Sequence, residues 1–189
     1  MRTIWVGLLL ASLLARADVP ELYGLTKRFE FIPERGIVDR CAWRTEDAVV
    51  SFIPPADWDI AVKIQEKKLT LRYVPFLSGI TIRVATNTPG SFPVWATAEA
   101  LRNQTIGKFP EALIREEFVG YSQAGSGPVI DIEVFRGASR SCYRVAWVPF
   151  NGGLIEFELA SPERYLVMCH GAWSLVLGSF RIEPIRKKE

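Results

Sequence analysis

The chain places a cysteine directly before its only histidine, as Cys169 and His170. A thiol nucleophile activated by an imidazole base needs both side chains within hydrogen-bond reach of each other. Adjacent residues point about 100° apart on a helix and to opposite faces of a strand, so this pair is badly oriented for mutual activation. Any histidine-based triad would have to use His170, and no G-x-S-x-G elbow occurs. We therefore predict no Cys/His or serine enzyme, and expect His170 to be a surface or capping side chain before Gly171.

The other residue types that could do chemistry are scattered. No C-x-x-C or H-x-x-x-H spacing occurs, so no metal or cofactor site is predicted. Pairs of carboxylates could hydrolyse sugars, and the candidates are Glu116 with Glu117 and Glu156 with Glu158. Because Glu156 and Glu158 share one face of a predicted strand, we interpret them as the solvated side of a half-buried sheet. A small secreted hydrolase that uses carboxylates is the alternative function.

The first 17 residues have the features of a secretory signal peptide. Arg2 supplies a positive charge, Ile4 to Leu14 form an apolar run, and Ala15-Arg16-Ala17 places small residues where a signal peptidase cuts. The run is shorter than the roughly 20 apolar residues that span a bilayer, and no later segment reaches that length. We expect cleavage before Asp18, export to the periplasm or the extracellular space, and no transmembrane segment.

Charge argues against a nucleic-acid partner. The full chain has 23 Lys and Arg against 21 Asp and Glu, but the predicted leader holds Arg2 and Arg16 and no acid. The mature chain then carries 21 of each, whereas nucleic-acid binding needs surplus cations on one face. With 49% hydrophobic residues and no repeat or linker, we predict one folded domain over residues 18–189.

Short β-branched and aromatic runs, bounded by Pro, Gly or Asn, predict strands along most of the chain. After Pro93 the apolar residues take helical spacing, which predicts a helix over Val94 to Lys108, and a second helix is expected within Arg164 to Gly178. This order predicts an α+β fold, with an antiparallel meander flanked by two main helices. The predicted strands are Lys27–Ile32, Ala48–Ile53, Leu69–Val74, Ile80–Ala85, Leu113–Gln123, Val129–Arg136, Ser141–Phe150 and Leu154–Leu159.

The last hairpin can be aligned by its apolar residues. A two-residue loop would set Trp147 opposite a glutamate, whereas a three-residue loop, Asn151-Gly152-Gly153, sets Trp147 opposite Phe157. Because a slip of one residue moves every side chain to the other face, we predict the three-residue loop. In this register Cys142 lies opposite Pro162.

The segment "VVSFIPPADWDI" (Val49 to Ile60), a strand running into Pro and then Trp, resembles the opening of the Mog1/PsbP-like fold. The segment "VWATAEALRNQ", the long meander and the closing "WSLVLGSFRI" are similar to that family too. The likeness covers most of Ala48 to Ile182 and leaves Asp18 to Asp47 unexplained. The family includes photosystem accessory subunits, a Ran-binding protein and secreted bacterial proteins. The resemblance implies an α/β/α sandwich and a non-enzymatic accessory or binding function, and it transfers no site residues.

Three cysteines are present, Cys41, Cys142 and Cys169. Export implies an oxidising compartment, in which cysteines pair and an odd one is left over. Cys169 lies seven residues beyond Pro162, so the returning chain could bring it within the roughly 7 Å between Cα atoms that a disulfide allows. We predict a disulfide between Cys142 and Cys169, with Cys41 free or paired between molecules. The alternative is three buried free thiols that pack as small hydrophobes.

Tryptophans are the candidate anchors for a partner. Trp95, Trp147 and Trp173 lie on apolar faces and are expected in the core. Trp43 and Trp58 stand near loops with charged neighbours, so we predict these two as surface anchors for a protein, peptide or glycan partner. The predicted function is a secreted, non-catalytic accessory or binding protein that needs no cofactor.

Overall fold

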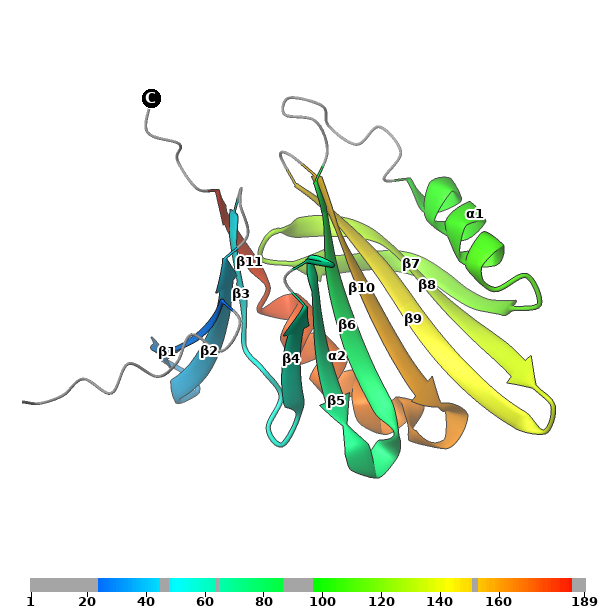
Figure 1. Ribbon diagram of the computed structural model, residues 1–189, viewed down its shortest axis with the longest axis horizontal. Coiled ribbons are helices and arrows are strands. Elements are labelled where there is room, and N and C mark those ends of the chain that lie inside the picture. Colours follow the sequence, from blue (N-terminus) through cyan, green and yellow to red (C-terminus); the bar gives the residue numbers. More distant parts are fainter. Residues whose placement is uncertain (1–23, 45–47, 64, 87–96, 151–152, 185–189) are drawn as a thin grey trace, which may run out of the picture.

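The computed structural model describes residues 24–44, 48–63, 65–86, 97–150 and 153–184. Two antiparallel sheets and two α-helices occupy these residues (Figure 1). The leader predicted over residues 1–17 and Trp95 lie outside the described residues, so the expectations about them stay predictions. None of the described helices is long and apolar enough to cross a membrane.

The larger sheet has seven strands in the order β4-β5-β6-β10-β9-β8-β7, and every neighbouring pair is antiparallel. Helix α1 (Ala98–Lys108) packs against β8, and α2 (Leu166–Gly178) packs against β10 and β7. The predicted α+β fold with an antiparallel meander and two helices is confirmed. The strands and short 3₁₀ turns are β4 (Asp59–Lys63), β5 (Lys68–Tyr73), η1 (Val74–Phe76), β6 (Ser78–Thr86), β7 (Leu113–Ser122), β8 (Gly125–Arg136), β9 (Ser139–Phe150), β10 (Gly153–Pro162) and η2 (Glu163–Tyr165).

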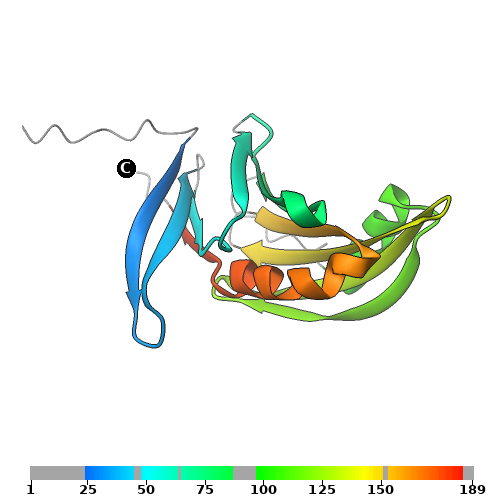
Figure 2. The ribbon, with the colours of Figure 1, turned by 90° about the horizontal axis from the view of Figure 1, so that it is seen from below.

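A smaller sheet has the order β1-β2-β3-β11. Strands β1 (Leu25–Ile32) and β2 (Gly36–Arg44) form a hairpin, β3 (Ala48–Phe52) follows β2, and β11 (Arg181–Pro184) brings the end of the described chain alongside β3. Figure 2 shows the β1–β2 hairpin standing apart from the seven-stranded sheet. Strands β2, β4 and β11 are not among the predicted strands. Four consecutive residues of β2 are buried, so both faces of this part of the strand are covered. The regular alternation of apolar and polar residues that identifies a half-buried strand is therefore absent.

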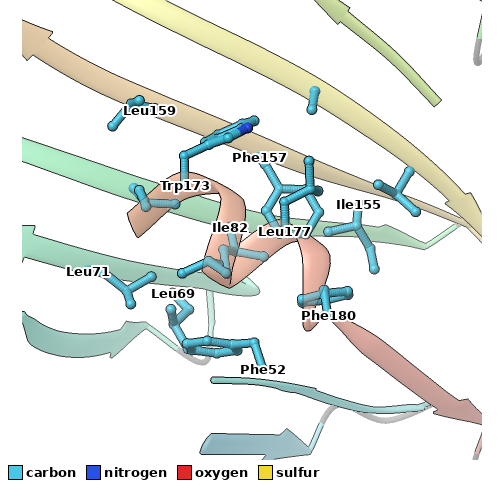
Figure 3. Packing of buried hydrophobic residues seen from close by; sticks show 14 of the residues in the cluster. Phe52, Leu69, Leu71, Ile82, Ile155, Phe157, Leu159, Trp173, Leu177 and Phe180 are labelled. Carbon is cyan, nitrogen blue, oxygen red and sulfur yellow. The ribbon is translucent and has the colours of Figure 1, made fainter. Parts of the chain in front are cut away.

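Each face of the seven-stranded sheet is partly covered by one helix. On the α2 face, Phe157 lies at the centre of the main core and makes edge contacts with Trp173 and Phe180 (Figure 3). On the α1 face, Trp147 packs with Leu101 of α1 in a second cluster. Trp147 and Trp173 are therefore core residues, as predicted.

The predicted register of the last hairpin is wrong. Residues 151–152 alone connect β9 to β10, so Trp147 lies opposite Glu156, while Phe157 lies opposite Ala146. The prediction assumed one buried face, but α1 covers the second face and Trp147 packs there, with its indole N–H donating to Glu156 Oε2 at 3.2 Å. Gly153 is therefore the first residue of β10 and not part of the loop, and the position requires glycine because a Cβ there would lie 2.3 Å from the carbonyl oxygen of Ala85.

Two element starts also differ from the prediction. Helix α1 begins at Ala98, where the Thr97 hydroxyl accepts a hydrogen bond from the Ala100 amide at 3.1 Å, and residues 94–96 lie outside the described part. Strand β8 begins at Gly125, ahead of the predicted start at Val129. Gly127 serves close packing inside β8, since a Cβ there would lie 1.7 Å from the carbonyl oxygen of Trp147.

Candidate functional site

The carboxylates considered for hydrolysis hold α1 against the sheet. Glu156 accepts a hydrogen bond from Gln104 of α1 at 3.0 Å, and Glu158 pairs with Lys108 of the same helix. Both glutamates are therefore largely covered, and their interpretation as a solvated sheet face is wrong because α1 lies over that face. Glu116 and Glu117 are exposed on β7, and Glu117 pairs with Arg102 of α1 at 3.5 Å.

Cys169 and His170 both lie on α2, and their side chains have different surroundings. Cys169 is fully buried, with its Sγ 3.8 Å from the Ser161 hydroxyl. His170 is half-buried and lies inside α2, which continues to Gly178, so it caps no helix end and is only partly at the surface. Its Nε2 atom is buried and has no hydrogen-bond partner in the described part of the chain. Burial, followed by the nearby Arg144 guanidinium, lowers the pKa of His170.

Cys41, Cys142 and Cys169 are all buried and free in the structure. Cys142 lies opposite Ser161 in the β9–β10 ladder instead of Pro162, because the register is shifted by one residue. Ser161 therefore neighbours both Cys142 and Cys169. Burial raises the pKa of Cys41 and Cys142, which disfavours their reactive thiolate forms. The disulfide itself stays a prediction.

Peptide mapping decides this prediction. In protein prepared through an oxidising compartment, we expect one disulfide between Cys142 and Cys169 and one free thiol at Cys41, after free thiols are blocked under denaturing, non-reducing conditions. Closing this loop would add roughly 3 kcal/mol to the free energy of unfolding in the chain-entropy treatment. Cys142→Ala and Cys169→Ala should then lower the melting temperature more in the oxidised protein than in the reduced protein. Three blocked cysteines would contradict the pairing.

Trp43 is not a surface anchor. Its side chain is 2% exposed and belongs to the main core, where it lies opposite Val50 of β3 and Leu25 of β1. The charged neighbour that suggested a surface position, Arg44, points to the other side of β2, since successive side chains of a strand alternate.

Trp58 is half-buried and stays a candidate anchor. It stacks on Tyr73 with ring centroids 5.7 Å apart, Tyr73 meets the edge of Phe76 at 4.7 Å, and Phe76 stacks on Tyr165 at 4.8 Å. The preceding residue, Asp57, has a φ of 62°, a left-handed conformation that Asp tolerates better than most residues. This row of rings fixes the orientation of Trp58, so the residue offers a rigid aromatic surface.

Trp58 lines a groove of about 610 Å³ between the β1–β2 hairpin, the segment before β4 and α2. We call this the hairpin groove. Its apolar lining includes Ile37 of β2, which is 73% exposed, and Leu175 of α2. Its charged lining carries both signs, with Lys27 and Arg35 against Asp39 and Asp57. Sequence reasoning missed Ile37, although the β-branched pair Ile37-Val38 after Gly36 is a strand signal.

An ion cluster fixes the hairpin wall of this groove to the rest of the protein. Arg40 of β2 pairs with Glu30 of β1 and donates from its guanidinium to the Ser179 carbonyl oxygen at 2.8 Å. Arg181 of β11 also donates to Glu30, at 2.7 Å. Hydrogen bonds from Arg40 and then Arg181 lower the pKa of Glu30, so the carboxylate is charged at neutral pH. The middle of the hairpin is therefore anchored at the end of α2.

Beyond the groove the hairpin exposes an apolar patch. Phe29 and Phe31 of β1 are 83% and 70% exposed, and Phe31 lies opposite Ile37 in the ladder. These three side chains share one face, since alternate residues of a strand point to the same side. We call them the hairpin patch. It runs from the groove to the outer edge of the smaller sheet.

A second groove, of about 490 Å³, lies beside α1 on strands β7 and β8. Leu101, Val119 and Pro128 line it, together with Glu117. Its one charged lining residue is Glu117, and its one aromatic lining residue, Phe118, packs against the main core. The hairpin groove is the stronger candidate, because it combines a rigid aromatic side chain, an exposed aliphatic one and charges of both signs.

Comparison with known proteins identifies the fold. No protein-family model and no curated protein matches the chain. The crystal structure of LpqN, involved in cell envelope biogenesis of Mycobacterium tuberculosis, is similar with a TM-score of 0.53 at 10% identity, over 85% of this chain and 92% of LpqN. The solution structure of PsbP (CyanoP) from Synechocystis sp. PCC 6803 is similar with a TM-score of 0.54 at 13% identity, over 90% of this chain and 99% of CyanoP. The chain therefore has the Mog1/PsbP-like fold, as its sequence resemblance indicates.

Proposed function

We propose that this protein is an exported, non-catalytic accessory protein of the cell envelope that binds a partner protein in the hairpin groove. The observation that carries the proposal is Trp58, a half-buried and stacked tryptophan facing a groove that also exposes Ile37. The predicted leader supports export, and LpqN, which has the same fold, is described as involved in cell envelope biogenesis.

The groove suits a protein segment with apolar side chains flanked by polar ones. Tryptophan is enriched among the residues that dominate binding energy, especially where neighbouring groups exclude water. Trp58 and Ile37 supply the apolar contacts, and Lys27 with Asp39 supplies charges that can pair with either sign on the partner. The predicted mature chain has equal numbers of acids and bases, so long-range attraction between net charges would contribute little.

The chemistry of the remaining side chains favours binding over the carboxylate hydrolase. Glu156 and Glu158 are engaged by Gln104 and Lys108 of α1. A general acid must carry a raised pKa, whereas hydrogen bonds from arginines lower the pKa of Glu30 and of Glu133. These carboxylates stabilise the fold through ion pairs.

Site-specific photocrosslinking tests this function. A photoreactive amino acid at Ala56, an exposed residue lining the groove, should crosslink to one envelope protein when the full chain is expressed in its host. Trp58→Ala and Ile37→Asp should each reduce the crosslinked product about tenfold or more, since loss of a central contact removes 2 kcal/mol or more of binding energy.

Val119→Asp is the matched control, because it places the same charge on an exposed aliphatic residue of a strand, in the groove beside α1. It should leave the crosslink unchanged. A crosslink that survives both groove variants, or one that Val119→Asp abolishes instead, would show that the partner does not bind in the hairpin groove.

A further inference from the structure

The outer edge of β1 has unpaired backbone groups. Arg44 donates its amide hydrogen to the Gly24 carbonyl oxygen at 3.5 Å, and hydrogen-bonded residues alternate along an antiparallel pair. Even-numbered residues of β1 therefore bond to β2, while Lys27, Phe29 and Phe31 direct their N–H and C=O groups away from it. In the described part of the chain no strand pairs with this edge.

The other sheet edges are shorter or irregular, which is how proteins discourage pairing between molecules. Strand β11 has four residues and β4 has five. Strand β7 is longer, but its ladder with β8 is interrupted between Ile114 and Glu116. Strand β1 has eight residues and a regular ladder with β2, and it exposes Phe29 and Phe31. It is therefore the edge best suited to accept another strand.

We propose that β1 pairs antiparallel with β1 of a second copy of this chain, about a two-fold axis at Phe29. A two-fold axis perpendicular to the sheet keeps each side chain on its own face, so the residues that it brings opposite each other are an even number of positions apart in the sequence. One residue must therefore lie opposite its own copy at the axis. Centring on Arg28 or on Glu30 would set like charges directly opposite, which is destabilising. Centring on Lys27 would do the same, and centring on Phe31 leaves only the end of the strand to pair. The register centred on Phe29 pairs residues 26–32.

Side chains on both faces are complementary in this register. Phe29 meets Phe29 of the second copy, and Lys27 lies opposite Phe31 of that copy, where its aliphatic stem can cover the ring. On the other face Arg28 lies opposite Glu30 of the second copy. Within its own hairpin Arg28 lies opposite Arg40, and no ion pair involves Arg28 in the described residues. Pairing thus gives Arg28 a carboxylate across the new ladder.

The pairing leaves the hairpin groove largely open, because Lys27 is its one lining residue from β1, and the others come from β2, the hairpin turn, the segment before β4, β4 and α2. This inference does not depend on the proposed function. It predicts a dimer that presents two grooves from one continuous sheet of eight strands, since each copy contributes the four strands of its smaller sheet.

Two cysteine variants test the register. Phe29→Cys should form a disulfide-linked dimer under mild oxidation, since directly opposed residues in a hydrogen-bonded pair have Cα atoms about 5.5 Å apart, within the range for a disulfide. Phe31→Cys is the matched control, because its counterpart lies four residues further along the partner strand, about 13 Å away. The readout is non-reducing electrophoresis, with the unsubstituted protein reporting any link through its own cysteines. Equal crosslinking of the two variants, or none in either, would overturn the proposal.

A charge reversal tests the interface independently. Arg28→Glu should raise the dimer dissociation constant about tenfold or more in analytical ultracentrifugation, because two favourable charge pairs become repulsive. Arg164→Glu, the same reversal at an exposed position on η2, should leave it unchanged. Far-UV circular dichroism of Arg28→Glu should match the unsubstituted protein, since the change also removes a like-charge neighbour of Arg40. A monomeric unsubstituted protein, or a dimer that Arg28→Glu does not weaken, would overturn the pairing of β1 with β1.

Discussion

Trp43→Ala should lower the free energy of unfolding by about 3–5 kcal/mol, the usual effect of truncating a buried tryptophan. Trp43 is 2% exposed and packs in the main core with Val50 and Phe52 of β3. The substitution removes these contacts and leaves a cavity where the smaller sheet meets the larger one. Urea unfolding followed by circular dichroism measures the loss.

Trp58→Ala provides the comparison. Because Trp58 is half-buried and its main aromatic contact is the stack on Tyr73, we expect a loss of about 1 kcal/mol in the free energy of unfolding. The two tryptophans should thus separate cleanly, with Trp43 affecting stability and Trp58 affecting partner binding. A loss of several kilocalories per mole in both variants would place Trp58 in the core too and would remove it as an anchor.

Glu30→Ala should lower the free energy of unfolding by about 2–4 kcal/mol, because it removes the partner of a buried cation. The Arg40 side chain is 8% exposed, and its second terminal nitrogen has no hydrogen-bond partner among the described residues. Without Glu30, the charge of Arg40 keeps only its bond to the Ser179 carbonyl oxygen. Arg181 loses the same carboxylate.

The same carboxylate predicts how stability depends on pH. Its folded-state pKa lies below the ordinary value of 4.5, so its contribution is present above about pH 4.5 and is lost as the pH falls through the lowered pKa. Glu30→Ala should therefore reduce the loss of stability on acidification below pH 4.5. Glu133, whose pKa is lowered by a hydrogen bond from Arg115, accounts for part of the remaining acid dependence in the variant.

Glu34→Ala is the control for both measurements, because Glu34 lies exposed in the turn of the same hairpin. It should change the free energy of unfolding by no more than about 0.5 kcal/mol. If Glu30→Ala and Glu34→Ala had equal effects, or if acid sensitivity were the same in Glu30→Ala as in the unsubstituted protein, the ion cluster would not be what anchors the hairpin.

Glu156 and Trp147 show where local sequence patterns predict the wrong environment for a side chain. The alternation around Glu156 and Glu158 suggested a solvated sheet face, but α1 covers that face and supplies Gln104 and Lys108 as partners. The register prediction was wrong for the same reason, because it did not include α1. It assumed that Trp147 needs an apolar residue opposite it on the neighbouring strand, but Trp147 is buried against α1 and lies opposite Glu156.

Of the candidate site, the sequence predicted Trp58 but not Ile37. Trp58 stood out as an aromatic residue between prolines and charged residues, but so did Trp43, and nothing local distinguishes them. Trp43 is buried because it lies in the sheet opposite Val50 of β3, on the face that packs against the core. Trp58 is less buried because it follows Asp57, a residue in the left-handed conformation, just before the edge strand β4. Nothing in the sequence indicated the hairpin patch, because aromatic residues that alternate along a strand, such as Phe29 and Phe31, are usually buried.

By itself the sequence determined the class of fold, the strands of the meander, the second helix and the likeness to PsbP, because alternation, helical spacing and turn residues act over a few neighbours. Only the tertiary structure decided which faces are buried, which residues pair across β9 and β10, and that β11 returns to β3. Those choices depend on contacts between segments far apart in the chain, such as Arg40 with the Ser179 carbonyl oxygen, 139 residues apart. The groove and the open edge of β1 are consequences of that long-range packing, which no local pattern encodes.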